Sequence, residues 1–423
     1  MKLVIIGAGT AGTELARRVR FFDKSASIIL VDKIGASQFS PCSLPYFIEG
    51  AMSDVSVYDS YEADGIIYER GFEVKYLEYK NDAKEITISK GDEEKKYSFD
   101  FLVIATGSNP IIPTIEGVSD FLILKTLDDA EKIKKITGSV LLIGGGYIGC
   151  EIAAGLSTKC RVTLVEAESH ILPFLEKDCS LIVKEHLENK GVIVIEGKKL
   201  TSLKESFLEE KSFDHIIYAV GSKPSLDILD KSTIPKKEIS FEHSKRPFEI
   251  YEDIFAIGDC SQEKNLVTGL YEHNLFANTA VKQAEILSQV LIGNISKERG
   301  FIRNAISKIG AITVGTVGIS KKDNSSLVVG KHDGFDAYKT CGGKRVYFKL
   351  YCTKEGHIKG CQAIGDGEIA GKLDLVSALI RFNKTIYDLL DIDYCYNPCV
   401  AGMHNPLFEA AKICVKKCNS FRK

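Results

Sequence analysis

Two glycine-rich turns most constrain how this chain can fold. The first, Gly7-Ala8-Gly9-Thr10-Ala11-Gly12, follows an apolar run at 3–6, and the second, Gly144-Gly145-Gly146-Tyr147-Ile148-Gly149, follows another at 140–143. The segments expected to continue each unit are a helix at 10–22 with a strand at 28–32, and a helix at 147–156 with a strand at 162–166. Each turn therefore joins the first strand and the helix of a βαβ unit, which predicts two dinucleotide-type folds in one chain.

The residue types of these turns suit a pyrophosphate. The first glycine allows the tight bend, the second lets backbone approach the phosphates, and the third lets helix and strand pack, while the helix N-terminus stabilises the anion. An acid at the end of the next strand can accept hydrogen bonds from ribose hydroxyls. The candidate cofactor contacts are Gly7, Ala8, Gly9, Gly12, Asp32 and Lys33 in the first unit and Gly144, Gly146, Tyr147, Ile148, Gly149 and Glu166 in the second.

Length and composition bound the remaining possibilities. The 423 residues predict two or three domains, and 55 Lys+Arg against 57 Asp+Glu give a net charge of -2, which disfavours a nucleic-acid partner. No apolar run approaches ~18 residues, so a membrane partner is not expected. Twelve cysteines with irregular spacing form neither a secreted disulfide framework nor a metal-ligand set, so we expect no metal and a reducing cytoplasm.

Three further segments resemble motifs of the two-dinucleotide flavoprotein reductases: 101–107 (FLVIATG), 253–259 (DIFAIGD) and 216–221 (IIYAVG). The resemblance covers essentially the whole chain. It implies that the N-terminal turn binds FAD, that the second turn binds NAD(P)H, and that Asp259 holds the flavin ribityl chain. It adds Ala105, Thr106, Gly107, Gly221, Gly258 and Asp259 to the cofactor-binding candidates. Because the carboxylate of Glu166 would repel a 2′-phosphate, NADH is favoured, with NADPH open if a basic residue compensates.

The expected fold class is α/β, with two Rossmann-like dinucleotide-binding domains and a C-terminal α+β dimerisation domain. The expected domains are 1–110 with 246–300 for FAD, 111–245 for NAD(P)H, and 301–423 for dimerisation. Alternating residues over 75–104 predict an antiparallel hairpin or meander that caps the first domain. After residue 301, strands are expected at 305–318, 345–352 and 358–365, followed by a helical stretch at 369–390.

One cysteine, Cys42, lies in the segment Gln38-Phe39-Ser40-Pro41-Cys42-Ser43-Leu44-Pro45-Tyr46. The two-cysteine reductases have C-x-x-x-x-C here, but Phe47 stands at the second position. The segment instead resembles the C-G-L-P-Y of the coenzyme A-disulfide reductase, NADH oxidase and persulfide reductase group, with Ser43 in place of Gly. A thiolate beside a flavin can attack a disulfide or sulfane sulfur, or become a sulfenic acid with peroxide. A thiol pKa lowered by the flavin and a helix N-terminus would favour each reaction.

The resemblance leaves coenzyme A open as a substrate. The coenzyme A-disulfide reductases have Ser-Phe-x-Asn-Cys before the thiol and a basic residue where this chain has Phe21. Arg17, Arg18 and Arg20 remain on the same predicted helix, where they could bind phosphates or form a solvated face. Arg70 stands where the family has a further basic contact.

The C-terminal segment 394–399 (YCYNPC) is similar to the family's Y-A-P-P stretch, which reaches into the other subunit's active site. The resemblance implies a homodimer with a shared site, in which Tyr396 and, in a looser match, Tyr338 protonate a leaving thiolate or pack at the interface. His404, five residues before Glu409 as in H-P-x-x-x-E, is either an acid-base group or a surface residue. The pairs Cys395/Cys399 and Cys414/Cys418 have i,i+4 spacing; the first could be an auxiliary dithiol, and the second is expected to be inert.

The leading interpretation is a cytoplasmic flavoprotein in which electrons pass from NAD(P)H through FAD to Cys42 and on to a small disulfide or persulfide, with coenzyme A among the candidates. The alternative is an NADH oxidase or peroxidase with Cys42 as a sulfenic acid. A third class is a redox sensor or electron-transfer partner that uses the C-terminal thiols.

Overall fold

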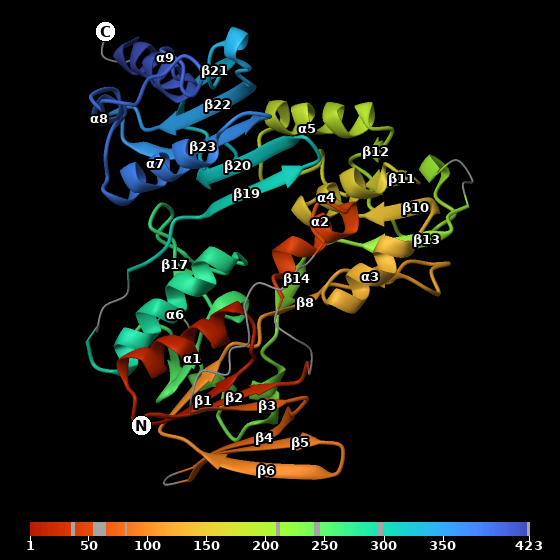
Figure 1. The fold of residues 1–423 in the computed structure, drawn as a ribbon, viewed down its shortest axis with the longest axis vertical. Coiled ribbons are helices and arrows are strands. Elements are labelled where there is room, and N and C mark those ends of the chain that lie inside the picture. The colour runs from red at the N-terminus through yellow and green to blue at the C-terminus, as the bar shows by residue number, and fades with distance from the viewer. Residues whose placement is uncertain are drawn as a thin grey trace.

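A computed structural model describes residues 1–34, 39–53, 65–80, 83–208, 212–240, 246–294 and 299–420. Gln38, in the segment before Cys42, lies outside the described residues. Three units are visible, with the N-terminal unit at the bottom of Figure 1, a second at the right and the C-terminal unit at the top. Within the described residues, no helix has the length and apolarity needed to cross a membrane.

The first unit is a six-stranded sheet in the order β15-β16-β7-β1-β2-β3. Its strands are β1 (Lys2–Ile6), β2 (Ser27–Asp32), β3 (Ile66–Arg70), β7 (Phe101–Ile104), β15 (Glu249–Tyr251) and β16 (Ile254–Ala256). Helices α1 (Thr10–Phe22) and α6 (Ala277–Leu291) pack against each other on one face. The other face carries the antiparallel meander of β4 (Glu73–Lys80), β5 (Ala83–Lys90) and β6 (Glu93–Ser98), which confirms the expected meander.

The alternation of side chains in β1 explains this layering. Leu3 and Ile5 are buried against α1 and α6, whereas Val4 and Ile6 are buried against the meander. Because successive side chains of a strand point to opposite faces, a strand covered on both faces must be apolar throughout, as the 3–6 run is.

The second unit is a five-stranded parallel sheet in the order β12-β11-β10-β13-β9. Its strands are β9 (Leu122–Ile123), β10 (Gly138–Ile143), β11 (Cys160–Val165), β12 (Ile193–Ile195) and β13 (His215–Tyr218), and its helices are α3 (Leu127–Lys135), α4 (Tyr147–Leu156) and α5 (Lys177–Asn189). The chain enters and leaves this unit through two antiparallel strands, β8 (Ser108–Pro110) and β14 (Ser222–Pro224). The two Rossmann-like units predicted from the glycine turns are therefore present.

Short elements complete the first two units. These are η1 (Pro41–Ser43), α2 (Leu44–Glu49), η2 (Ser206–Leu208), η3 (Asp227–Lys231), η4 (Lys236–Glu238), η5 (Gly258–Cys260), β17 (Glu263–Lys264) and β18 (Tyr271–Glu272).

The third unit is a five-stranded antiparallel sheet in the order β19-β20-β23-β22-β21. Its elements are β19 (Asn304–Ile309), β20 (Ile312–Gly318), β21 (Val328–Phe335), η6 (Lys339–Cys341), β22 (Arg345–Cys352), β23 (Ile358–Gly365), α7 (Ala370–Arg381), α8 (Ile386–Leu390) and α9 (Pro406–Ser420). Helices α7 and α9 share one buried apolar cluster with the sheet, and Ile309, Val314 and Ile364 pack against the second unit instead.

Two expectations for this unit were wrong in detail. The helical stretch expected at 369–390 is two helices, because Asn383 has a left-handed φ of 51° and Thr385 begins α8 with a capping box to Asp388. Strand β21 was missed, since its sequence, VVGKHDGF, contains two glycines and three polar residues. Strand β21 lies at the edge of the sheet and pairs only with β22. Glycines and polar residues are tolerated in an edge strand.

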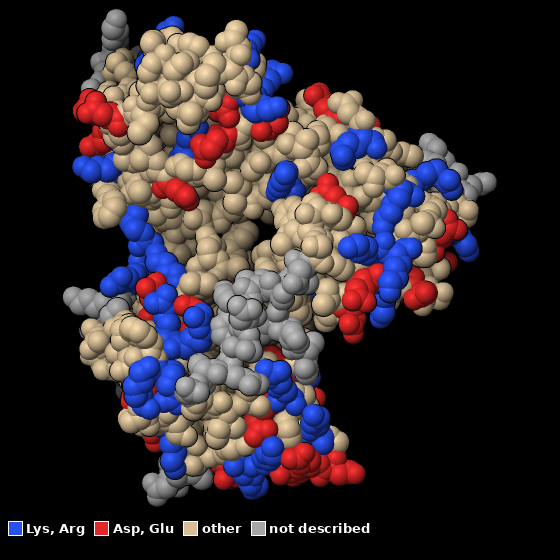
Figure 2. All heavy atoms as spheres, viewed as in Figure 1, with Lys and Arg blue, Asp and Glu red and all other residues tan. Residues whose placement is uncertain are grey.

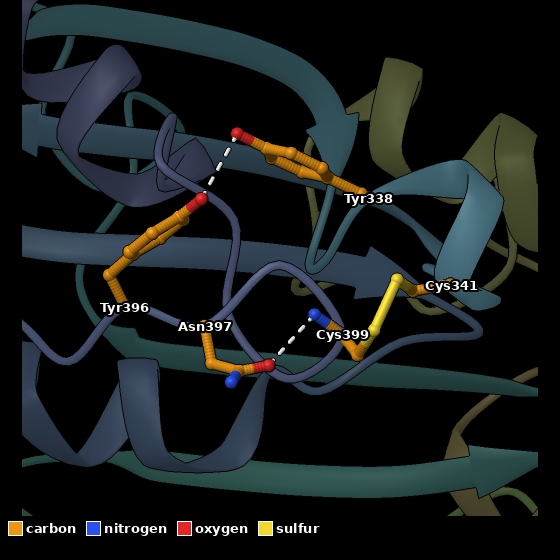
Figure 3. Close-up of a disulfide and its surroundings, with 5 residues drawn as sticks. All are labelled: Tyr338, Cys341, Tyr396, Asn397 and Cys399. Atoms are coloured by element: carbon orange, nitrogen blue, oxygen red, sulfur yellow. Dashed lines mark hydrogen bonds between the residues drawn. A yellow bond between two sulfur atoms is a disulfide. The ribbon is translucent and has the colours of Figure 1, made fainter.

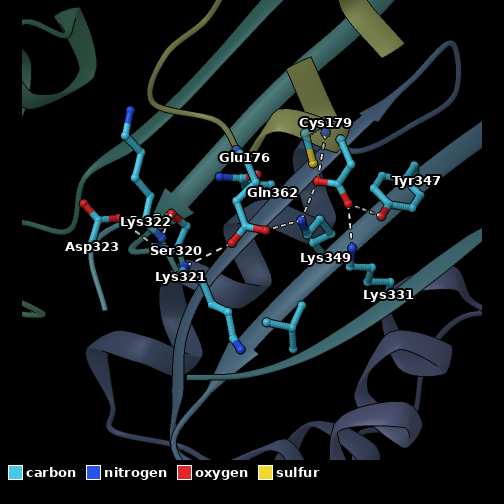
Figure 4. A network of polar contacts seen from close by, with 12 residues as sticks. Glu176, Cys179, Ser320, Lys321, Lys322, Asp323, Lys331, Tyr347, Lys349 and Gln362 are labelled. Carbon is cyan, nitrogen blue, oxygen red and sulfur yellow. Dashed lines mark hydrogen bonds and ion pairs between the residues drawn. The ribbon is translucent and has the colours of Figure 1, made fainter. Parts of the chain in front are cut away.

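A buried lysine joins the third unit to the second (Figure 4). The side chain of Lys349, on β22, is fully buried. Its Nζ donates to Glu176 and, at 2.6 Å, to Asp178 Oδ1 at the start of α5. Lys331 donates to the other oxygen of Asp178 at 2.6 Å, and the Lys321 backbone N–H donates to Glu176 at 3.1 Å. Carboxylates and lysines from two units thus satisfy one another at their interface.

Candidate functional site

The first glycine turn has the geometry of a dinucleotide-binding loop. Gly7 has a φ of +104°, a left-handed conformation that glycine adopts without strain. Gly9 is the N-cap of α1 and no side chain caps this helix, so its first N–H groups face the turn. The carboxylate of Asp32 accepts from the backbone N–H of Ala8 at 2.7 Å and of Ile34 at 2.6 Å.

The second turn repeats this arrangement. Gly144 has a φ of +107°, and Gly146 is the N-cap of α4 without a side-chain cap. Glu166 accepts from Gly145 N–H at 2.6 Å and from Glu168 N–H at 2.7 Å. The sequence assigned Asp32 and Glu166 to ribose; the structure shows that each acid also holds the backbone of its own turn in place.

The central glycines show that both turns leave space for a ligand. A Cβ added to Gly12 would lie 1.9 Å from the Gly7 carbonyl oxygen, and one added to Gly149 would lie 1.9 Å from that of Gly144, so the fold itself requires these glycines. Gly9 and Gly146 have ordinary φ values of -72° and -74°, and a Cβ there would meet nothing within 4 Å. Their place at uncapped helix N-termini therefore fits the close approach of a pyrophosphate.

Because each turn has its own open glycine, an alanine variant in one turn should impair the binding of one cofactor and leave the other unaffected. Gly9→Ala should lower FAD affinity by about tenfold or more without raising the KM for NADH, because its methyl group would fill only the first turn. Gly146→Ala should raise that KM and leave FAD retention unchanged. FAD titration of the apoprotein and steady-state kinetics measure the two effects. Equal losses of both cofactors in either variant, at unchanged thermal stability, would contradict separate sites.

The remaining residues of the first site lie around Asp259. Gly258 has a φ of +75°, and Asp259, in η5, accepts from Ser108 Oγ at 2.9 Å. Burial raises the pKa of Asp259, while Ser108 and Lys125 oppose the shift. The loop of Ala105, Thr106 and Gly107 is fixed to the returning strand, because Thr106 Oγ1 donates to the Ser225 carbonyl and Ser225 N–H donates to the Gly107 carbonyl at 2.9 Å. Gly221, with a φ of +95°, precedes that strand.

Lys125 is a residue that the sequence analysis missed. Burial lowers the pKa of its ammonium group, Asp259 raises it, and Lys33 lowers it, so the three charged groups share one neighbourhood. A lysine between the short strand β9 and the capping box of α3 was the available signal. Lys125 therefore places a positive charge near Lys33 and Asp259, two of the residues predicted to bind FAD.

Cys42 lies in η1, immediately before α2. Pro41 occupies the first position of this turn, where its fixed φ suits helical geometry. Ser43 has φ -88° and ψ -13° and donates to the Ser40 carbonyl at 2.7 Å, so serine is accommodated where the related group has glycine. Cys42 is free and exposed. The structure thus presents this thiol rather than burying it.

The sequence analysis attributed a lowered thiol pKa to a bound flavin and a helix N-terminus, whereas the charged groups of the protein near Cys42 raise this pKa. Desolvation raises the pKa of Cys42, and the negative charges of Glu151 and Asp259 raise it further. The same influences place Cys42 between an acid of the first unit and an acid of the second. Any factor that favours the thiolate must therefore come from a bound group or from protonation of these acids.

Glu151 connects all three units behind Cys42, and the sequence analysis missed it. Its Oε1 accepts from Tyr46 Oη at 3.2 Å and from Ser307 Oγ at 2.6 Å, while Tyr46 Oη also accepts from the Lys308 N–H at 3.2 Å. Burial raises the pKa of Glu151 to about 7, although both hydrogen bonds oppose the shift. The signal was an isolated acid in the otherwise apolar helix α4. A carboxyl group that titrates near neutrality can hold or release a proton close to Cys42.

The two candidate tyrosines lie together in the third unit (Figure 3). Tyr396 Oη donates to Tyr338 Oη at 3.4 Å, and both side chains are exposed. A disulfide joins Cys341 to Cys399, each three residues after one of the tyrosines. The expected Cys395/Cys399 dithiol is therefore wrong: Cys395 is a free, exposed thiol, since Cys399 pairs with a cysteine 58 residues away that the i,i+4 spacing did not reveal.

The tyrosine pair lies across the C-terminal sheet from the Cys42 of the same chain. Lys308, which contacts Tyr46, is in register with Thr313, Gly365, Val346 and Gly334. Four strand spacings of ~4.8 Å place Gly334 ~19 Å from Lys308. Tyr338 follows four residues beyond Gly334, at the sheet edge opposite to β19, which contacts α4 of the second unit.

Other candidates have more ordinary surroundings. His404 is 79% exposed, with Nδ1 3.6 Å from Glu409, which also pairs with Lys412 at 2.7 Å. Arg20 donates to the carbonyls of Lys24, Ala26 and Gly65, so it is engaged in fixing backbone. Arg18 pairs with Glu14 and Glu285, and Arg17 with Glu14. Arg70 stacks on Tyr68 at 4.4 Å, and Phe21 is exposed.

Two further observations concern the last cysteine pair and metal binding. Cys414 and Cys418 are buried in α9 and form no disulfide; Cys414 Sγ donates to the Leu350 carbonyl at 3.5 Å and Cys418 Sγ to the Thr353 carbonyl at 3.7 Å, which agrees with inert thiols. Among the residues that the structure describes, no cluster of His, Cys, Asp and Glu could hold a metal ion.

Comparisons with known proteins agree with this arrangement. The profile of the family described as pyridine nucleotide-disulphide oxidoreductase matches residues 1–284. An NADH oxidase of Methanocaldococcus jannaschii is 29% identical over 99% of both chains, and a CoA-dependent NAD(P)H sulfur oxidoreductase of Pyrococcus abyssi is 26% identical over 97% of both. The NAD-dependent persulfide reductase from A. fulgidus superposes with a TM-score of 0.89 at 25% identity, covering 99% of this chain and 84% of that one.

The chemistry of this family uses two dinucleotide cofactors, which the two glycine turns can accommodate. When bound, a nicotinamide dinucleotide would supply a hydride and FAD would accept it and pass on the electron pair. The turns with Asp32 and Glu166 have the geometry that would hold the two cofactors, and the exposed thiol of Cys42 is close to Asp259 of the first unit and Glu151 of the second. The chain is an oxidoreductase with FAD and NAD(P)H as cofactors, and it belongs to the pyridine nucleotide-disulphide oxidoreductase family.

Proposed function

We propose that this enzyme reduces a small disulfide or persulfide, with coenzyme A as its thiol part, using electrons from NAD(P)H delivered through FAD to Cys42. The observation that carries the proposal is the single exposed thiol of Cys42 beside Glu151 and Asp259, with Phe47 where two-cysteine reductases have their second thiol. The relative from Pyrococcus abyssi is named a CoA-dependent sulfur oxidoreductase, which supports this substrate class.

In the proposed reaction, the Cys42 thiolate attacks the substrate disulfide, a mixed disulfide forms, and one thiol leaves. The electron pair supplied through FAD then cleaves the mixed disulfide and restores the thiolate. Glu151, with a pKa of about 7, is placed to exchange a proton near this sulfur. Tyr338, Tyr396 and His404 are the candidates for protonating the leaving thiolate.

We further propose a homodimer in which the tyrosine pair serves the Cys42 of the second copy. Tyr338 follows the β21 edge of the sheet, ~19 Å across it from the strand that contacts Tyr46, and this separation favours a role at the Cys42 of a second copy. The surrounding loop exposes large apolar side chains, with Tyr396 50%, Met403 51% and Val400 76% exposed. An apolar, unpartnered surface that carries candidate catalytic residues is typical of an interface between subunits.

Positive charge near α6 supports an anionic substrate such as coenzyme A. Figure 2 shows Lys and Arg atoms gathered over α6, beside a hollow where the first and third units meet. Burial lowers the pKa of Lys282 on this helix, and the charges of Arg381 and Arg299 lower it further, while those of Glu263 and Glu285 oppose the shift. Arg381 donates to the carbonyls of Arg299 and Gly300. A bound phosphate would reduce the electrostatic repulsion between these cations.

Two finer assignments belong to the same proposal. NADH is preferred to NADPH, because the buried carboxylate of Glu166 ends β11 where a 2′-phosphate would approach. The protein works in the cytoplasm, because ten of its twelve cysteines are free thiols.

The alternative function is an NADH oxidase or peroxidase in which Cys42 cycles through a sulfenic acid. The relative from Methanocaldococcus jannaschii is named an NADH oxidase, and an exposed thiol beside a flavin suits this chemistry equally.

The mass of the intact, air-purified protein after removal of flavin distinguishes the two functions. We expect a reducible adduct of coenzyme A size, or of one sulfur atom, that disappears in Cys42→Ser and after treatment with a thiol reductant. An adduct of oxygen alone on Cys42 would instead establish the oxidase or peroxidase.

A further inference from the structure

The Cys341–Cys399 disulfide lies at the exposed end of the tyrosine loop, where both cysteines are exposed. The two bridged segments are held together without it: Tyr338 N–H donates to the Pro398 carbonyl at 2.8 Å, and Gly402 N–H donates to the Asp336 carbonyl at 2.8 Å. The bridge therefore duplicates contacts that the backbone already makes, which argues against a purely structural role.

The rest of the chain's cysteines make this bridge unusual. Ten cysteines form no disulfide, among them the buried Cys352 and Cys418, whose thiols share a hydrogen bond at 4.0 Å. An exposed disulfide is accessible to an attacking thiolate, whereas a buried thiol is not. Each bridged cysteine follows a tyrosine of the pair by three residues, so the bridge and the proposed proton donors form one surface feature.

We propose that Cys341–Cys399 is a second redox centre, which accepts an electron pair from the Cys42 of a second copy of this chain. The inference rests on the proposed dimer with its shared site. It differs from the proposed function in that the acceptor is a disulfide of the enzyme itself.

The exchange balances as follows. The Cys42 thiolate attacks Cys399 Sγ, the Cys42–Cys399 bond forms, the Cys341–Cys399 bond breaks, and Cys341 leaves as a thiolate. The electron pair of NAD(P)H, passed through FAD, then cleaves Cys42–Cys399 into two thiolates. In sum, NAD(P)H, one proton and the disulfide give NAD(P)⁺ and two thiols.

The local charges favour Cys341 as the leaving sulfur. Lys339 and Lys344 lie within three residues of Cys341, whereas the segment 394–403 around Cys399 contains no charged side chain. Nearby positive charge stabilises a departing thiolate, and a thiol of lower pKa leaves faster. Attack is therefore directed at Cys399, beside Tyr396 and the exposed Val400.

Differential alkylation of the holoenzyme tests the exchange. The protein is incubated with NADH without oxygen, treated with iodoacetamide, and mapped by peptide mass. We expect Cys341 and Cys399 to become alkylated in the wild type and to stay bonded in Cys42→Ser. Cys395, an exposed free thiol in the same loop, should be alkylated in every sample and serves as the internal control.

A trapping variant tests the predicted bond directly. In Cys341→Ser, Cys399 is a free thiol, and mild oxidation should produce a covalent dimer whose linked peptides contain Cys42 and Cys399. The dimer should be lost in the double variant Cys341→Ser/Cys42→Ser and after dithiothreitol.

The outcomes separate this inference from the proposed function. A bridge that NADH leaves intact, in a sample that reduces coenzyme A disulfide through Cys42, would overturn the inference and leave the proposed function standing. Equal reduction of the bridge in Cys42→Ser would also overturn it. Cys42-dependent reduction of the bridge without turnover of coenzyme A disulfide would support the inference and count against the proposed substrate.

Discussion

Replacing Lys349 with methionine is expected to lower the free energy of unfolding by about 3–5 kcal/mol, because it removes one partner of a buried ionic network. The side chain of Lys349 is fully buried, and Glu176 and Asp178 would lose its charge at the interface of two units. Methionine has a similar volume, so the loss comes from carboxylates that no longer face their buried cation rather than from a cavity. Chemical denaturation monitored by fluorescence and by circular dichroism measures the effect.

A matched control lies on the neighbouring strand. Lys331 pairs with the same Asp178, but its side chain is 49% exposed, so Lys331→Met should cost no more than about 1 kcal/mol. Adding Glu176→Gln and Asp178→Asn to Lys349→Met should recover part of the loss, because the uncompensated charges disappear. Equal effects of Lys349→Met and Lys331→Met would contradict the role assigned to burial.

The same network predicts a dependence on pH. Although burial would raise it, hydrogen bonds from Lys331 and Lys349 hold the pKa of Asp178 at about 2, below its ordinary value of 3.8. A carboxyl whose folded pKa is depressed contributes stability above its unfolded pKa and loses that contribution as the pH falls through the folded one. The wild type should therefore lose this contribution between pH ~4 and ~2, and Lys349→Met should lose less over that interval.

The second large effect concerns catalysis. Cys42→Ser should lower turnover of coenzyme A disulfide by roughly 10³-fold or more, because serine cannot form the mixed disulfide. Reduction of bound FAD by NADH without oxygen should persist, since hydride transfer does not involve the thiol. Turnover with NADH and stopped-flow absorbance of the flavin measure the two steps separately.

Cys395→Ser is the control for Cys42→Ser, because Cys395 is also an exposed free thiol. It should retain turnover. If Cys42→Ser keeps its disulfide turnover, the proposed function is wrong. If it loses disulfide turnover but still consumes NADH with oxygen, the flavin reacts with oxygen independently of the thiol.

Features that depend on contiguous residues could be predicted from the sequence. The glycine turn at 7–12 and its repeat at 144–149 predicted two βαβ units, and the structure has both. The alternation over 75–104 predicted the meander. These succeed because backbone conformation and the exposure of one face follow from local residue types and their period.

Electrostatic properties could not be predicted in the same way. The thiol pKa of Cys42 is raised by desolvation and by the charges of Glu151 and Asp259, which lie 109 and 217 positions further along the chain. Their influence depends on how the first two units fold and pack, and sequence spacing carries no information on that packing.

The sequence by itself thus determined two dinucleotide turns, a lone redox cysteine and the family to which they belong. Only the tertiary structure decided which distant groups meet: Glu151 with Tyr46 and Ser307 behind Cys42, Lys125 with Asp259, and Cys341 with Cys399. The physical reason is that the range of an interaction in space is a few ångströms, whereas these partners are 58 to 156 positions apart in the chain. Such pairs form only when the chain has folded into its tertiary structure.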